Sequence, residues 1–200
     1  MDSPLSESPS LRAICDAIPS LVFLADRDVQ VLDANQAARE WLRVEPGTAL
    51  RQAGGEVMRC VFALNSAGGC GTTEACPTCV LRESVTTTRP GSPGRSRVAH
   101  MVLETPQRAE DRWFRVTASP VVLGGRDLVL VSMEDVSQLV ELREVLPVCP
   151  GCGTSPRDAK EVLREARAYL TRHPGHWSTS ELCPECMRTK PPAPWKEGAF

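Results

Sequence analysis

The sequence predicts an α+β protein: a five-stranded antiparallel sheet with helices on one side, followed by a small helical module that binds zinc. Two observations lead to this fold class. Apolar runs of strand length occur as a pair near the start of the chain and as three more after a helical middle. Nine cysteines are present, and eight of them fall into two groups of four. At 200 residues, 42% hydrophobic and 24% charged, the chain can form one domain with an appendage.

The first part of the chain reads as a hairpin followed by helices. Strands are expected at 21–25 and 29–32, separated by an acidic turn. Asn35 has the side chain of a helix N-cap and precedes an expected helix over 36–42. A further helix is expected over 56–64, with Cys60 on its apolar face.

The second part of the domain reads as three consecutive strands, at 97–104, 113–123 and 127–134. Apolar and polar residues alternate in the second of these, which indicates that one face is covered. Gly124 and Gly125 predict the hairpin turn into the last strand.

A composition shift and the prolines divide the chain into segments. Ser155 and Pro156 form a good helix start, and the helix in the C-terminal module should run to about His173. The expected segments are a disordered N-terminus (1–10), the sheet-bearing domain (11–137), a helical connector (138–146), a four-cysteine module (147–190) and a tail (191–200).

The two cysteine groups have spacings that suit metal ligation. The second group is Cys149, Cys152, Cys183 and Cys186, two Cys-x2-Cys pairs that bracket one helix. Reduced cysteines at this spacing can direct both sulfurs to one tetrahedral zinc ion. A module of this size with few large apolar residues also needs the folding free energy that a bound metal contributes. We therefore predict zinc at the second group.

The first group, Cys60, Cys70, Cys76 and Cys79, is spread over a glycine-rich loop. Four thiolates hold either zinc or an iron–sulfur cluster, and spacing does not choose between them. A dithiol/disulfide switch and unligated thiols are further interpretations. The ninth cysteine, Cys15, reads as a packed helix residue.

Charge and composition exclude several classes of function. The formal net charge is −2, and the module from 147 onward has eight Lys and Arg against six Asp and Glu, so nucleic-acid binding is not expected. No apolar run approaches the length of about 18 residues that a membrane span needs. Residues 1–9 lack the basic and apolar regions of a secretory signal, so a cytoplasmic protein is expected. No nucleotide-binding or Ser-His-Asp pattern occurs, so we expect no enzyme.

Three short segments over 11–137 resemble PAS domains. Segment 18–26 (IPSLVFLAD) looks like the start of the first strand, 32–38 (LDANQAA) like the turn into the first helix, and 134–137 (EDVS) like the end that couples the last strand to an output helix. The resemblance implies a sensory domain. Some PAS sensors bind haem or flavin, but His100 falls in a strand and the flavin-photosensor motif is missing, so neither is expected.

The cysteine groups add two narrower resemblances. Segment 69–79, with Cys60 before it, resembles a cysteine-bearing subset of PAS domains in bacterial sensory proteins. Segment 146–186 is similar to a C-terminal module of some bacterial PAS and response-regulator proteins, which also implies metal binding. Relatives often have a histidine before the last pair, where this chain has 177–180 (WSTS), so no histidine ligand is expected.

Together these features predict a bacterial sensory protein that binds metal through cysteines and signals redox state, oxygen or a small ligand. The partner would be a protein such as a histidine kinase or response regulator, or a second copy of the chain through the domain and connector. Two alternatives stay open: a thiol redox enzyme that uses a Cys-x2-Cys pair, and a structural adaptor with two zinc ions.

Overall fold

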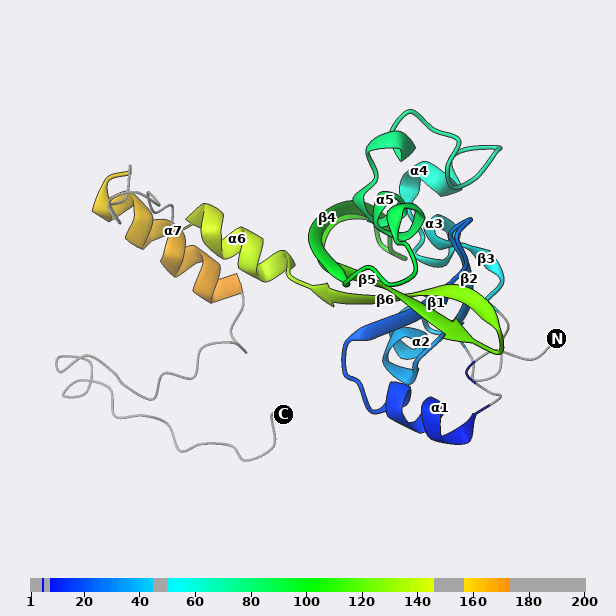
Figure 1. Cartoon of the computed structure of the whole chain (residues 1–200). Helices are drawn as coiled ribbons and strands as arrows, with labels where there is room; N and C mark the ends of the chain where they lie inside the picture. The colour runs from blue at the N-terminus through cyan, green and yellow to red at the C-terminus, as the bar shows by residue number, and fades with distance from the viewer. Residues whose placement is uncertain (1–4, 6–7, 45–49, 146–156, 173–200) are drawn as a thin grey trace. The chain divides into compact units, whose positions relative to one another are not determined.

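The structure is a computed structural model that describes residues 5, 8–44, 50–145 and 157–172. The chain forms two compact units, Met1–Val140 and Glu141–Phe200. The first unit contains a curled antiparallel sheet with several short helices packed against it (Figure 1). This confirms the predicted α+β class for the first unit.

Six strands make up the sheet, in the order β3-β2-β1-β6-β5-β4. Their bounds are β1 Leu21–Ala25, β2 Gln30–Ala34, β3 Gln52–Ala53, β4 Arg95–Glu104, β5 Ala109–Leu123 and β6 Arg126–Asp135. The prediction of five strands was wrong by one, because β3 is a two-residue strand that pairs with the start of β2. A strand this short has no hydrophobic periodicity that a sequence could reveal.

The helices of the first unit are short. They are α1 Pro9–Asp16, α2 Gln36–Leu42, α3 Gly54–Val57, α4 Val61–Leu64 and α5 Val80–Thr87, with a single 3-10 turn, η1, at Cys76–Thr78. As predicted, Asn35 caps α2, since its side chain accepts a hydrogen bond from the Ala38 N–H. After the η1 turn, α5 begins at Val80 with Cys79 at its N-cap position.

The single helix predicted over 56–64 is interrupted in its middle. Arg59 has a left-handed backbone with φ +56°, and Cys60 is extended, so α3 ends and α4 begins anew. Cys60 instead forms a bridge with Leu103 on β4. The contact of Cys60 with the sheet thus interrupts the helix. The spacing of apolar residues in 56–64 does not reveal this contact.

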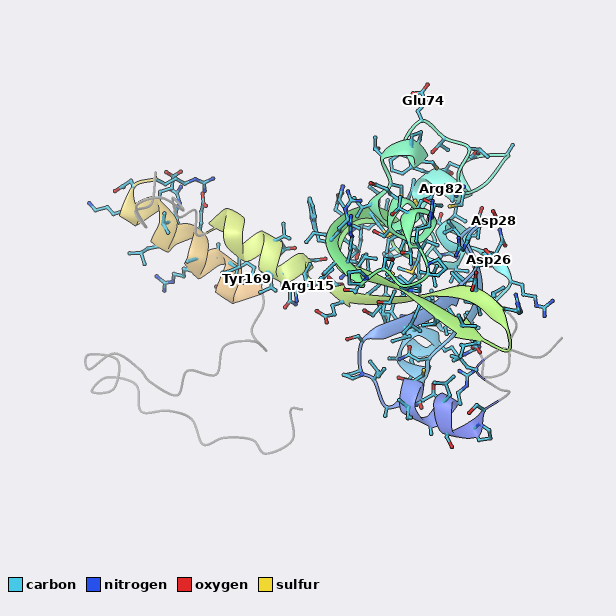
Figure 2. All side chains as sticks on the ribbon, in the orientation of Figure 1. Asp26, Asp28, Glu74, Arg82, Arg115 and Tyr169 are labelled. Carbon is cyan, nitrogen blue, oxygen red and sulfur yellow. The ribbon has the colours of Figure 1, made fainter. Side chains whose placement is uncertain are left out.

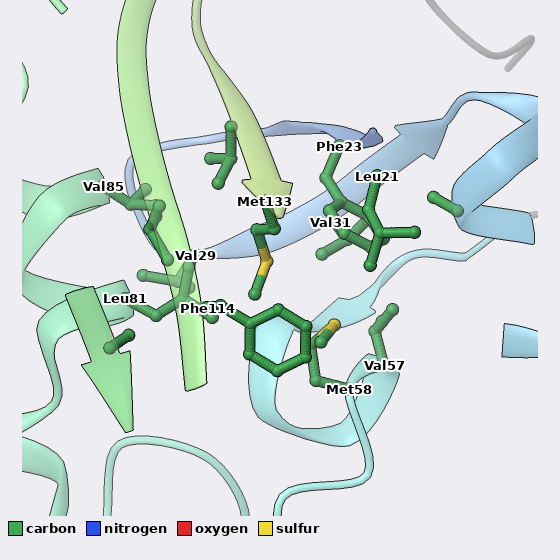
Figure 3. Packing of buried hydrophobic residues seen from close by; sticks show 14 of the residues in the cluster. Leu21, Phe23, Val29, Val31, Val57, Met58, Leu81, Val85, Phe114 and Met133 are labelled. Carbon is green, nitrogen blue, oxygen red and sulfur yellow. The ribbon is translucent and has the colours of Figure 1, made fainter. Parts of the chain in front are cut away.

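The main core lies between the sheet and α2–α5. Alternate residues of β5 and β6 point into it, and Phe114 and Met133 are at most 1% exposed (Figure 3). A cavity of about 20 Å³ lies inside this core, bounded by side chains such as Phe23, Val131 and Leu81. This volume is close to that of one water molecule, so this cavity has no room for a larger ligand.

A second, smaller core covers the other face of the sheet, so the prediction of helices on one side only was incomplete. Cys15 of α1 packs there with Leu24 and Leu128, and Leu5 completes the cluster at 1% exposure. Leu24 follows Phe23 in the same strand, and successive strand residues point to opposite faces. Leu5 belongs to this packed cluster although it lies within the segment 1–10 that the sequence predicts to be disordered. Residues 1–4 and 6–7 lie outside the described residues.

A buried carboxylate ties this N-terminal segment to the rest of the unit. Asp33 is fully buried on β2 and accepts hydrogen bonds from Arg12 at 2.7 Å and Arg39 at 3.0 Å. The backbone N–H of Leu5 donates to the same carboxylate at 3.2 Å. Two guanidinium partners compensate the cost of burying this charge.

Two further helices follow the sheet. α6 spans Ser137–Val145, where the connector was predicted, and α7 spans Ala159–Arg172 in the second unit. In α7, Tyr169 is buried and Glu165 accepts a hydrogen bond from Arg157 at 2.7 Å. No helix of the described segments is both long and apolar enough to span a bilayer.

Candidate functional site

A cavity of about 290 Å³ in the first unit is lined by all four cysteines of the first group. Its walls come from the α3–α4 segment, the loop after α4, the start of α5 and the middle of β4. The lining residues are Val29, Gly55, Cys60, Phe62, Ala63, Cys70, Ala75, Cys76, Thr78, Cys79, Val80, Leu81, Arg82, His100, Met101 and Val102. This is the size range of a small-ligand pocket.

Two of the four cysteines are packed against the core. Cys60 and Cys79 are half-buried and contact the main hydrophobic cluster. Both occupy N-cap positions, Cys60 before α4 and Cys79 before α5. Their backbones are therefore held by the elements that they precede, and both residues line the cavity.

Cys70 lies on the loop and faces α3 and α5. Its N–H donates to Oε1 of Glu56 at 2.7 Å, and Nη1 of Arg82 lies 4.0 Å from its sulfur. A Cβ on Gly55 would lie only 2.9 Å from that sulfur, so α3 approaches the loop closely because residue 55 has no side chain. Burial raises the pKa of the Cys70 thiol, and the nearby charges of Glu56 and Cys76 act in the same direction.

Cys76 begins the η1 turn and has a different environment. Its sulfur accepts a hydrogen bond from the Gly71 N–H at 3.2 Å and lies 3.1 Å from the Thr73 hydroxyl. Burial alone would raise the pKa of the Cys76 thiol. The hydrogen bonds of Thr73 and Gly71, together with the charge of Arg82, outweigh burial and lower this pKa below its ordinary value.

Sequence reasoning did not single out the charged residues around the sulfurs. Arg82 lies on α5 beneath the loop whose tip carries Glu74 (Figure 2). His100 of β4 also lines the cavity; its Nε2 lies 2.6 Å from Asp111 and its ring contacts Trp113. The one available signal is that Arg82 follows Cys79 by three residues, a spacing that places both on one side of a helical turn.

The structure leaves both metal predictions untested. Among the described residues, no group of three or more His, Cys, Asp or Glu side chains is arranged to hold a metal ion. All five described cysteines are free thiols. The four cysteines of the second group, Cys149, Cys152, Cys183 and Cys186, lie outside the described residues. Zinc at the second group and zinc or an iron–sulfur cluster at the first remain predictions.

A comparison with protein families matches residues 10–75 to the PAS domain. The match begins in α1 and ends in the cysteine-bearing loop. It supports the PAS resemblance of the sequence over these residues, which lie in the first unit. A search of curated proteins found no match to the chain.

Several solved PAS domains are similar to this chain in structure. That of nitrogen regulation protein NR(II) from Vibrio parahaemolyticus is 14% identical, with a TM-score of 0.45 over 64% of this chain and 99% of that one. That of an HTR-like protein from Haloarcula marismortui is 16% identical, with a TM-score of 0.42 over 65% and 97%. That of BvgS from Bordetella pertussis is 12% identical, with a TM-score of 0.42 over 84% and 98%.

Proposed function

We propose that the protein is a non-catalytic sensor whose input site is the cysteine-lined cavity of its PAS domain. The observation that carries this proposal is that all four cysteines of the first group border one cavity of about 290 Å³. The cavity in the main core has room for about one water molecule. Of these two cavities, the cysteine-lined one alone has both the space and the reactive groups for a chemical input.

The sheet supplies a direct route from the cavity to the output end of the domain. His100, Met101 and Val102 of β4 line the cavity, and β4 pairs with β5 along its whole length. β5 pairs in turn with β6, which leads into α6. A change in the cavity that displaces β4 would therefore be transmitted to the start of α6 through two continuous strand pairings.

We further propose that the cavity cysteines bind a metal. Support comes from the four thiol side chains that line one cavity. Soft thiolate ligands favour zinc or an iron–sulfur cluster. Anaerobic purification of the full chain, with iron and zinc assays and a visible absorption spectrum, tests this proposal. Metal that is lost from Cys60→Ser/Cys79→Ser but kept in Cys15→Ser supports it, and a colourless metal-free cavity contradicts it.

The four-cysteine module at the C-terminal end is proposed to hold a structural zinc ion. Support comes from the two Cys-x2-Cys pairs and from the low apolar content of the segment. The full chain should contain a zinc ion that is lost from Cys149→Ser/Cys183→Ser and kept in Cys70→Ser/Cys76→Ser. Zinc content that is unchanged in the first double variant contradicts the proposal.

The output of such a sensor requires a second protein surface. We propose a protein partner of the histidine kinase or response-regulator type, or a second copy of this chain, that contacts α6. A structural adaptor would bind the same partner with equal affinity whether or not the cavity is modified. A thiol redox enzyme would turn over a dithiol substrate. Partner binding measured before and after thiol modification separates these alternatives from the sensor.

A further inference from the structure

Cys70 and Cys76 lie in one loop of the cavity, and the Cys76 sulfur lies close to the backbone beside Cys70. The Gly71 nitrogen is 3.2 Å from the Cys76 sulfur. Since that nitrogen is about 2.4 Å from the Cα of Cys70, the Cys76 sulfur lies within about 5.6 Å of that Cα. In a disulfide, a sulfur is about 2.0 Å from the partner sulfur and therefore at most about 4.8 Å from the partner's Cα. A rotation of the Cys70 side chain with a small shift of the loop therefore suffices to bring the two sulfurs together.

The two sulfurs have complementary surroundings. The Cys76 sulfur accepts from the Gly71 N–H and lies against the Thr73 hydroxyl, and such donors stabilise negative charge on sulfur. The Cys70 sulfur is held against α3 and faces the Arg82 guanidinium. Both side chains are half-buried and line the cavity, so a small molecule that enters it meets both.

Arg82 gives the cavity a positive charge beside the sulfurs. Its side chain is half-buried, and within the described part of the chain it forms no ion pair with a carboxylate. A guanidinium in such a position stabilises an oxygen that leaves with negative charge. The cavity thus combines an activated sulfur, a second sulfur and a cation.

We propose that a hydroperoxide oxidises this pair to a Cys70–Cys76 disulfide; the proposal rests on the sensing role of the cavity. The Cys76 thiolate attacks the terminal oxygen, so an S–O bond forms, the O–O bond breaks, and the other oxygen leaves and takes a proton to become an alcohol or water. The Cys70 sulfur then attacks the Cys76 sulfur. An S–S bond forms, the S–O bond breaks, and the hydroxyl leaves as water with the Cys70 proton. Two electrons pass from the two thiols to the hydroperoxide.

Peptide mapping of the full chain after treatment with hydrogen peroxide tests the product. Cleavage after Arg and Glu separates 60–74, which carries Cys60 and Cys70, from 75–82, which carries Cys76 and Cys79. We expect these peptides to be joined by a disulfide in the wild type and in Cys60→Ser/Cys79→Ser. Either Cys70→Ser or Cys76→Ser should abolish the link. A link that requires Cys60 or Cys79 overturns the proposal.

The order of the two steps is tested by trapping the sulfenic acid with dimedone. Cys70→Ser should accumulate a dimedone adduct on Cys76, and Cys76→Ser should give at least about tenfold less adduct on Cys70. Arg82→Gln should slow oxidation by about tenfold, and Arg82→Lys should restore most of the rate. A faster reaction at Cys70 than at Cys76 overturns the assigned roles. Thermal unfolding of each variant verifies that it is folded.

This test can fail separately from the sensing role. If a bound metal ion protects both cysteines from peroxide, the disulfide proposal is overturned but the cavity remains the input site. If the disulfide forms and amide exchange in α6 is the same in both oxidation states, the redox pair stands and the sensing role fails.

Discussion

Asn35 is a fully buried amide that joins α1, β1 and α2. Its oxygen accepts two backbone N–H groups, and its nitrogen lies within hydrogen-bond distance of three backbone carbonyls. The partners are the N–H groups of Val22 and Ala38 and the carbonyls of Cys15, Ile18 and Ser20. One side chain therefore satisfies backbone groups of three elements that the sequence places apart.

Asn35→Ala should destabilise the protein by about 3 kcal/mol, because it leaves several buried backbone groups without partners and removes the α2 cap. Chemical denaturation monitored by circular dichroism measures this. The matched control is Asn65→Ala at an exposed position, which should change the free energy of unfolding by less than about 0.5 kcal/mol. Equal effects of the two substitutions would contradict the role of Asn35.

The two loop cysteines should differ in their reactivity toward iodoacetamide. The pKa of the Cys76 thiol is lowered by its hydrogen bonds, and that of Cys70 is raised by burial. Since the thiolate is the reacting form, Cys76 labelling should reach its full rate at a lower pH than Cys70 labelling. Mass spectrometry of Cys60→Ser/Cys79→Ser in a chelating buffer, from pH 6 to pH 10, measures both rates. Identical pH profiles would contradict this assignment.

At the level of helices and strands, the sequence predicts those elements that a local pattern of residues determines. The strands and the Asn35 cap have clear signatures in apolar runs, alternation and cap chemistry. The break between α3 and α4 has none, because it depends on the bridge from Cys60 to Leu103 across 43 residues. For the same reason Glu56 and Arg82 could not be assigned to the cysteine site, since only the folded chain brings them to the loop.

The loop between α4 and η1 is anchored by Glu56 through the Cys70 N–H. Glu56→Ala removes this acceptor and should increase the rate of amide exchange over 65–76. Glu56→Gln keeps a carbonyl oxygen at the same position and should preserve most of the protection. The control is Glu74→Ala at the exposed tip of the same loop (Figure 2). Unchanged exchange in Glu56→Ala would show that the loop is held by other contacts.

The start of α6 is fixed to β5 by Ser137, whose hydroxyl accepts the Trp113 N–H at 2.9 Å. Asp135 adds a second tie, since it accepts from the Ser137 N–H and from Arg112. Ser137→Ala should cost about 1 kcal/mol and increase amide exchange at the start of α6. Ser96→Ala, at an exposed position on β4, is the control. If Ser137→Ala lowered the free energy of unfolding without a local increase in amide exchange at the start of α6, the specific coupling of α6 to β5 would be contradicted.

For the whole molecule, the sequence grouped four cysteines and the structure places all four on one cavity. In the structure, two of these cysteines pack against the core and two lie on the loop. The spacing of the cysteines in the sequence does not distinguish the two pairs. Both findings bear on one claim: that chemistry at the cavity alters the end of the domain from which α6 leaves.

Hydrogen–deuterium exchange of the full chain before and after alkylation of the cavity cysteines tests this claim most directly. The account predicts that alkylation changes exchange in β4 and at Ser137–Val145, and that a variant with serine at all four cavity cysteines shows no such change. A change confined to 60–82, with β6 and α6 unaffected, would contradict it.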